Sequence, residues 1–130
     1  MKPGKDVAVA RCVALSIVLL MVWYFITSDA IRSDNAFLVP DALLTVLLFT
    51  SAVLPHRIAV PALIFSFAWA AAVYTTSLCS YAVRGQFAEG ANHLALIIPS
   101  VVMAMLLARR VVSQTGTNEN EQVRRDRSLT

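Results

Sequence analysis

The chain has 130 residues, of which 58% are hydrophobic and 15% are charged, and its formal net charge is +3. Soluble domains have about 45–50% apolar and about 25% charged residues, so a water-soluble fold of this length would expose apolar surface that it could not cover. This composition excludes a typical cytosolic enzyme, a nucleic-acid-binding protein, a disordered chain and a disulfide scaffold. With a mean hydropathy of +0.67, it predicts an all-α, polytopic membrane protein.

Four apolar stretches follow one another along the chain. A helix that crosses the hydrocarbon core needs about 20 mostly apolar residues, and the stretches at residues 7–27, 36–54, 58–83 and 91–108 have that length. Their connections are short and polar, which favours an antiparallel up-down-up-down bundle of four transmembrane helices over residues 1–112. Residues 113–130 are polar with few aliphatic side chains, so we expect a disordered cytoplasmic tail.

The distribution of basic residues predicts the orientation of these spans. Only Arg32 and Arg84 lie in the connections on one side. The other side carries most of the positive charge, at Lys2, Lys5, Arg11, Arg57, Arg109, Arg110, Arg124, Arg125 and Arg127. The positive-inside rule therefore predicts that the helices lie in the plasma membrane with the N- and C-termini in the cytoplasm.

The third stretch contains a row of small residues at intervals of four. Membrane helices associate through close packing, which small side chains permit, because lipid tails are as apolar as the helices themselves. We therefore expect helix packing along the row formed by Ala68, Ala72, Thr76 and Ser80.

Polar side chains gather at the predicted outer ends of the helices. This outer ring consists of Asp29, Asp34, Asp41, Tyr81, Arg84, Glu89 and His93. Within it, Asp41 and His93 are candidate catalytic residues, because a carboxylate and an imidazole at the mouth of an apolar bundle can act as general base and acid. The alternative interpretation is polarity at the level of the lipid headgroups, with Asp41 complementing the dipole of its helix in the first turn.

Two aromatic residues of the third stretch are candidates for lining a cavity. Trp69 lies near the centre of the span, away from the interfaces that Trp prefers. Its indole N–H needs an acceptor there. Helix packing is one role for Trp69, and lining a cavity together with Tyr74 is the other.

No cofactor or metal site is predicted. Cys12 and Cys79 should lie near opposite membrane faces, too far apart for a disulfide, and the chain has no CxxC motif. His56 and His93 also fall on opposite faces, which disfavours a paired-histidine metal site. The four glycines form no phosphate-binding loop.

Three classes of function remain. In each of them the lipid bilayer is the partner, and no binding of nucleic acid is predicted. The absence of a catalytic motif favours an accessory subunit or self-associating bundle, as a homo-oligomer or in a larger membrane complex. A small isomerase, cyclase or hydrolase acting on a lipophilic substrate at the outer face is the alternative. An oligomeric transporter or channel is the third class, although carriers usually need an ionisable group deep in the membrane, and Asp41 lies near a helix end.

Overall fold

The computed structural model describes residues 5–28 and 35–128, and the regular structure in this part of the chain is entirely helical. The all-α fold class is therefore confirmed. The elements in chain order are α1 (Lys5–Thr27), α2 (Leu38–Val53), α3 (His56–Val83), α4 (Phe87–Gly90), the 3-10 helix η1 (Ala91–His93) and α5 (Leu94–Ser128).

Three helical segments are long and apolar enough to cross a membrane: Lys5–Thr27, His56–Val83 and Phe87–Thr117. The second predicted span, residues 36–54, corresponds to α2, which has 16 residues. At a rise of 1.5 Å per residue, α2 is about 24 Å long, whereas the hydrocarbon core is about 30 Å thick. The helices thus have the composition of a small membrane protein, with α2 the shortest of the apolar helices.

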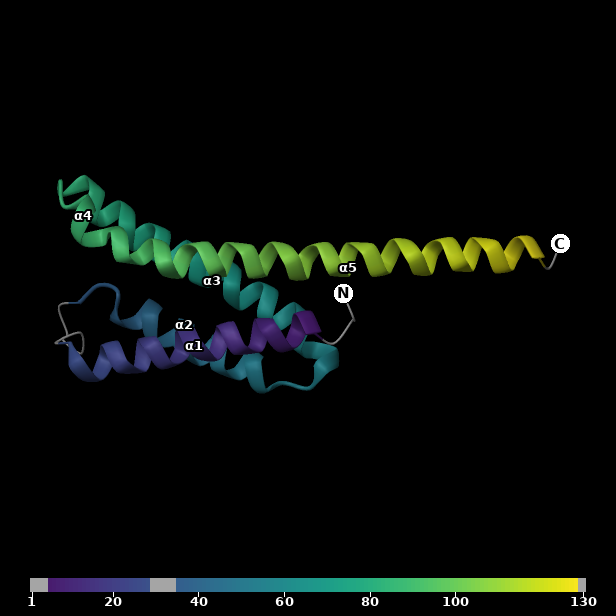
Figure 1. Ribbon diagram of the computed structural model, residues 1–130, viewed down its shortest axis with the longest axis horizontal. Helices are drawn as coiled ribbons and strands as arrows, with labels where there is room; N and C mark the ends of the chain where they lie inside the picture. The colour runs from purple at the N-terminus through teal and green to yellow at the C-terminus, as the bar shows by residue number, and fades with distance from the viewer. Residues whose placement is uncertain (1–4, 29–34, 129–130) are drawn as a thin grey trace.

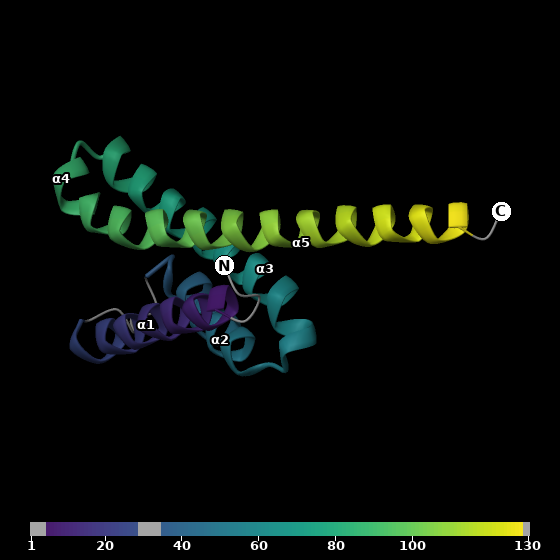
Figure 2. The ribbon, with the colours of Figure 1, turned by 45° about the vertical axis from the view of Figure 1, so that its right-hand side comes forward.

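The long helices run alternately in opposite directions, and they form two pairs (Figures 1 and 2). Helix α1 packs along α2, and α3 packs along α5. Helix α2 also packs on α3 and so joins the pairs. The pairs diverge towards the end that carries α4 (Figure 1).

The core lies where the two pairs meet. Phe67 is fully buried, and it belongs to one hydrophobic cluster with Leu44 and Leu48 of α2 and Ala14 of α1, which are fully buried as well. A hydrogen bond of 2.8 Å between the hydroxyls of Ser51 and Ser66 links α2 to α3 inside this core. Such bonds satisfy polar groups that have no access to water.

The expected packing row on α3 lies on a different face from the observed one. Ala68, Ala72 and Thr76 are exposed, and Ser80 is only partly buried. The buried face instead contains Ala59, Leu63, Ser66, Phe67, Ala70, Tyr74 and Ser77. Because α3 has small residues on both faces, spacing alone does not identify the packed one. The larger side chains fill the space between the pairs, while Ala70 and Ser66 allow close approach.

The C-terminal segment also differs from the expected disordered tail. Helix α5 continues without a break to Ser128 and projects beyond the other helices (Figure 1). Extending an existing helix avoids the unfavourable nucleation step. The spacing of Glu121 and Arg125 suits an ion pair one turn apart.

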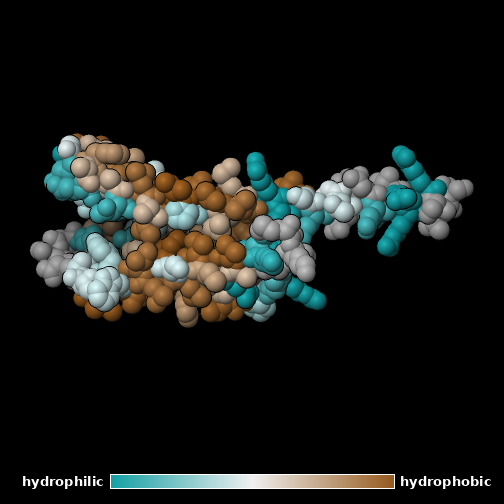
Figure 3. Space-filling view, viewed as in Figure 1, coloured by the Kyte–Doolittle hydropathy of each residue, from teal (hydrophilic) through white to brown (hydrophobic). Residues whose placement is uncertain are grey.

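Hydrophilic surface covers both ends of an apolar belt in the space-filling view (Figure 3).

An arginine of α1 caps the end of α2. At the end of the bundle opposite α4, the Nη2 of Arg11 donates a hydrogen bond to the carbonyl of Leu54, just after α2 ends. The last carbonyls of a helix have no partner inside the helix. Arg11 of α1 therefore caps α2 and fixes the register of the first helix pair.

The burial pattern of α3 predicts that one substitution destabilises the protein at one alanine and not at a second alanine two residues away. Ala70→Leu should lower the free energy of unfolding by about 1–3 kcal/mol because the added atoms have no room in the core. Ala72→Leu should change it by less than about 0.5 kcal/mol because Ala72 is exposed. Both can be measured by circular dichroism during detergent unfolding. Equal effects, or a larger effect at Ala72, would contradict the packing of α3.

Candidate functional site

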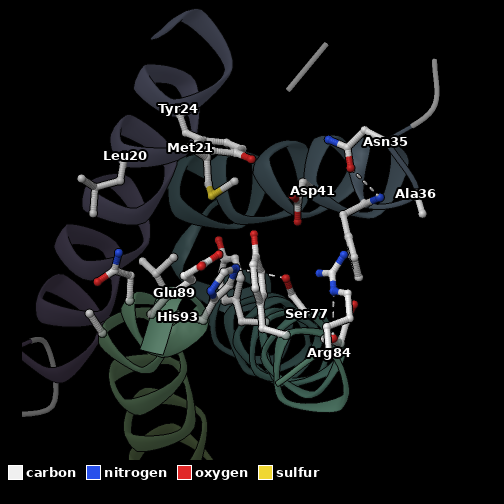
Figure 4. Close-up of a pocket in the computed structure, with 17 residues that line it drawn as sticks. Leu20, Met21, Tyr24, Asn35, Ala36, Asp41, Ser77, Arg84, Glu89 and His93 are labelled. Atoms are coloured by element: carbon white, nitrogen blue, oxygen red, sulfur yellow. Dashed lines mark hydrogen bonds between the residues drawn. The ribbon is translucent and has the colours of Figure 1, made fainter. Parts of the chain in front are cut away.

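A cavity of about 760 Å³ lies between the helix pairs at the end that carries α4. Figure 3 shows a hollow at this end with hydrophilic surface inside, and Figure 4 shows the side chains that line it. Ligand pockets usually have volumes of about 300–1,000 Å³. The cavity therefore has the size of a small-molecule site, and it exists because the pairs diverge here.

The two walls of the cavity differ in character. Helix α1 contributes Leu20, Met21 and the ring of Tyr24, which form a largely apolar wall (Figure 4). Across the cavity, α3 and the segment from α4 to the start of α5 contribute hydroxyl, carboxylate, amide and imidazole groups. The cavity can therefore hold a molecule that has both an apolar part and a polar part.

Polar residues of α3 follow one another along a single helix face. Tyr74, Ser77, Tyr81 and Arg84 are separated by three, four and three residues, a spacing that keeps them on the same side of a helix. Tyr74 is 2% exposed, and its hydroxyl has no hydrogen-bond partner among the residues that the structure describes. A buried hydroxyl without a partner is rare in native proteins and needs an explanation.

Ser77 and His93 form the central contact of the cavity. The Oγ of Ser77 lies 3.0 Å from Nε2 of His93, and Nδ1 of His93 lies 2.9 Å from the carbonyl oxygen of Gly90. Because a carbonyl oxygen only accepts, Nδ1 of the neutral imidazole carries the proton and donates to Gly90. Nε2 is then the acceptor, and the Ser77 hydroxyl donates to it (Figure 4).

The turn between α3 and α5 places His93 against α3. Gly85 ends α3 with a φ of 72°, a conformation that glycine adopts without strain. At Gly90, an added Cβ would lie 2.7 Å from the Cβ of Tyr81, so only glycine allows the backbone to come this close. The His93 ring lies 5.6 Å from the ring of Tyr81 and 6.4 Å from that of Tyr74, measured between centroids.

Charged groups of both signs surround this contact. Asp41, in the first turn of α2, is close enough to His93 and Tyr74 to interact with them electrostatically. The guanidinium of Arg84 lies 4.9 Å from the centroid of the Tyr81 ring, a cation–π contact, while its Nε donates to the carbonyl of Ser80. Glu89 also lines the cavity. A ligand in the cavity thus meets both acidic and basic side chains.

The cavity contains most of the outer ring predicted from the sequence. Asp41, Tyr81, Arg84, Glu89 and His93 all line it, while Asp29 and Asp34 lie outside the described residues. Tyr74 lines the cavity as well, but Trp69 does not. Trp69 is 40% exposed and lies against the ring of Phe65 on the outer face of α3, with 6.0 Å between the centroids.

Several lining residues were not identified from the sequence, and Ser77 is the most important of them. Its spacing from Tyr74 and Tyr81 is the signal that could have found it, because the three residues form a polar stripe at helical intervals. The apolar wall on α1 carries no comparable signal, since Leu20 and Met21 resemble any other residues of a membrane span. Only the arrangement of the helices shows which of them face the cavity.

Within residues 5–28 and 35–128, no group of three or more His, Cys, Asp or Glu side chains is placed to hold a metal ion. Comparisons of the chain with protein-family models, with curated proteins and with solved structures find no match. The geometry of the cavity is therefore the basis for assigning a function.

The close contact at Gly90 predicts different effects of alanine at two glycines. Gly90→Ala should destabilise the protein by about 1–3 kcal/mol because the new methyl group collides with Tyr81. It should also shift the ring nitrogen resonances of ¹⁵N-labelled His93. Gly116→Ala is the control, since nothing lies within 4 Å of an added Cβ there. A His93 spectrum that is unchanged in Gly90→Ala would contradict the proposed role of this turn.

Proposed function

We propose that the chain is a plasma-membrane protein whose helices cross the bilayer four times, and that its cavity binds an amphiphilic ligand at the outer face. Both termini would then lie in the cytoplasm. The excess of Lys and Arg at the end opposite the cavity supports this orientation. A bilayer that thins locally can accommodate a short span such as α2, and the apolar residues that flank α2 lengthen its apolar segment to 36–54.

The single observation that carries ligand binding is the buried, unpaired hydroxyl of Tyr74 in a cavity with one apolar and one polar wall. Leaving such a group without a partner costs about 1–3 kcal/mol. A polar ligand atom that hydrogen-bonds to Tyr74 would remove this cost. The apolar part of the same ligand would lie against Leu20 and Met21 of α1.

An accessory subunit of a larger membrane complex is the second candidate function. The extension of α5 to Ser128 favours it, because this helix projects past the bundle and leaves its surface available to a partner (Figure 2). Ligand binding in the cavity does not use this surface. Removal of residues 113–130 should therefore release a co-purifying partner and leave ligand binding unchanged.

Binding can be tested with three probes that share a dodecyl chain and differ in headgroup: dodecanol, dodecanoate and dodecylamine. We expect at least one probe to raise the unfolding temperature of the purified protein in nanodiscs in a saturable manner. Loss of one hydrogen bond in Tyr74→Phe should weaken that binding about 3- to 10-fold. Thr76→Ala is the matched control, since Thr76 is exposed on the same helix and does not line the cavity. Equal affinities of the two variants, or the absence of saturable binding by all three probes, would refute the proposal.

The orientation can be tested with single cysteines in a background in which Cys12 and Cys79 are serine. We expect Gln86→Cys, in the turn before α4, to react with a membrane-impermeant maleimide in intact cells. Ser113→Cys should react only after the cells are permeabilised. Reaction of both positions from outside, or the reverse pattern, would contradict the proposed topology.

A further inference from the structure

We propose that Ser77 and His93 act as nucleophile and general base in the hydrolysis of an acyl ester, and that Tyr74 stabilises the oxyanion. This inference rests on the proposed function, because the substrate would occupy the cavity assigned there to an amphiphilic ligand. It adds a covalent reaction, which ligand binding alone does not require, and it names the substrate class as an acyl ester.

The geometry of the Ser77–His93 pair suits nucleophilic catalysis. An activated serine needs a base within hydrogen-bond reach, and that base needs a third group to orient it. The 3.0 Å contact from the Ser77 hydroxyl to Nε2 of His93 meets the first condition. The 2.9 Å contact from Nδ1 to the Gly90 carbonyl meets the second and sets the tautomer in which Nε2 is free to take a proton.

The hydroxyl of Ser77 bonds differently from most of the other helix hydroxyls, and unlike Ser51 and Ser66 its partner is an imidazole. Serine and threonine in helices commonly donate to the carbonyl four residues earlier. Ser16, Thr76 and Ser100 do so, on α1, α3 and α5. The Ser77 hydroxyl instead bonds to an imidazole on another element, and it faces the cavity. Thr76, its neighbour in the chain, is the internal comparison.

Negative charge develops on the carbonyl oxygen during ester hydrolysis. A tetrahedral intermediate needs hydrogen-bond donors near its oxyanion. The Tyr74 hydroxyl lies one turn before Ser77 on the same face of α3, is buried, and has no partner in the described part of the chain. It is therefore available to donate to the carbonyl oxygen of a bound ester.

In the proposed membrane orientation, Ser77 lies near the level of the ester bonds of lipids. Helix α3 has 28 residues and is about 42 Å long, so each end extends about 6 Å past a hydrocarbon core of about 30 Å. Ser77 lies six residues before the end of α3, or about 9 Å along the helix. For α3 centred in the bilayer and parallel to its normal, residue 77 is thus about 3 Å inside the hydrocarbon boundary. In an acyl lipid, the ester bond joins the apolar chain to the polar headgroup and lies at this boundary.

The reaction proceeds in two steps, the acylation and the deacylation of Ser77. Ser77 Oγ attacks the ester carbonyl carbon, and its proton moves to Nε2 of His93. The bond to the alcohol oxygen then breaks, and the alcohol leaves with that proton, so that an acyl-Ser77 ester remains. A water molecule attacks this ester and gives a proton to Nε2, and the return of the proton to Oγ releases the carboxylic acid and restores the pair. The carboxylate of Asp41 favours the imidazolium that forms in each step, because the two groups interact electrostatically.

The test uses the full chain in nanodiscs, with a long-chain alkyl fluorophosphonate and p-nitrophenyl dodecanoate as probes. We expect the fluorophosphonate to modify Ser77, as located by peptide mass spectrometry, and the ester to release p-nitrophenolate. Ser77→Ala should abolish both reactions. His93→Gln should slow them about 10²- to 10⁴-fold, since glutamine cannot accept the proton. Tyr74→Phe should reduce ester hydrolysis about 10²- to 10³-fold, and Thr76→Ala should behave as the wild-type protein.

Binding of the dodecyl probes separates failure of this inference from failure of the proposed function. The circular dichroism spectrum of Ser77→Ala should match that of the wild-type protein, which shows that the variant is folded. If the wild-type protein binds a dodecyl probe but Ser77 is not modified and no ester is hydrolysed, the inference is wrong while the proposed function stands. Hydrolysis that persists in Ser77→Ala would also overturn it. Release of fatty acid from the nanodisc lipid would assign a membrane lipid as substrate, and hydrolysis of the soluble ester alone would assign a free amphiphilic ester.

Discussion

The fold depends on one constraint, which is that polar groups enclosed by apolar helices must find hydrogen-bond partners within the protein. Ser51 and Ser66 satisfy each other between α2 and α3, and Ser100 donates to a carbonyl of its own helix. Arg11 caps the end of α2 in the same way. The Oδ1 of Asp6, the Nε of Arg11 and the hydroxyl of Tyr74 are buried without a hydrogen-bond partner among the described residues, and of these three only the Tyr74 hydroxyl belongs to a residue that lines the cavity.

The cavity follows from the way in which the helices pair. Helix α2 holds the pairs together through α3, and near α4 the pairs diverge. The turn after α3 brings His93 back onto the exposed edge of this space, because Gly90 lets the chain pack directly on Tyr81. A bundle whose helices stayed in contact along their whole length would bury the same polar residues without access for a ligand. Divergence of the pairs therefore creates the site and gives its residues a common surface.

The sequence predicts the helical class and the polar end of the bundle, but not the face on which each helix packs. Hydropathy identifies the apolar helices because composition alone decides that property. The positions of Asp41, Glu89 and His93 near the ends of these helices also predict that the three residues lie at the same end of the bundle.

The rotation of α3 about its own axis cannot be predicted in this way. Both Ala70 and Ala72 suit close packing, and only the neighbouring helices determine which of them is buried. Without the rotation of α3, the polar stripe that contains Ser77 could not be assigned to the cavity. The helix past residue 112 forms as a continuation of the apolar part of α5, and the local composition of residues 113–128 does not predict it.

The stability of the bundle does not account for the Ser77–His93 contact. Hydrogen bonds between membrane helices contribute about 0.6 kcal/mol on average, and Ser51 and Ser66 make such a bond without ionisable groups. Placing an imidazole and a carboxylate among apolar helices is unfavourable by comparison. The contact also lines an open cavity, whereas the Ser51–Ser66 bond is enclosed by the core. A polar cluster that adds little to folding, and that faces a cavity with a free hydroxyl beside it, is better explained by the binding and chemistry of a ligand than by the packing of helices.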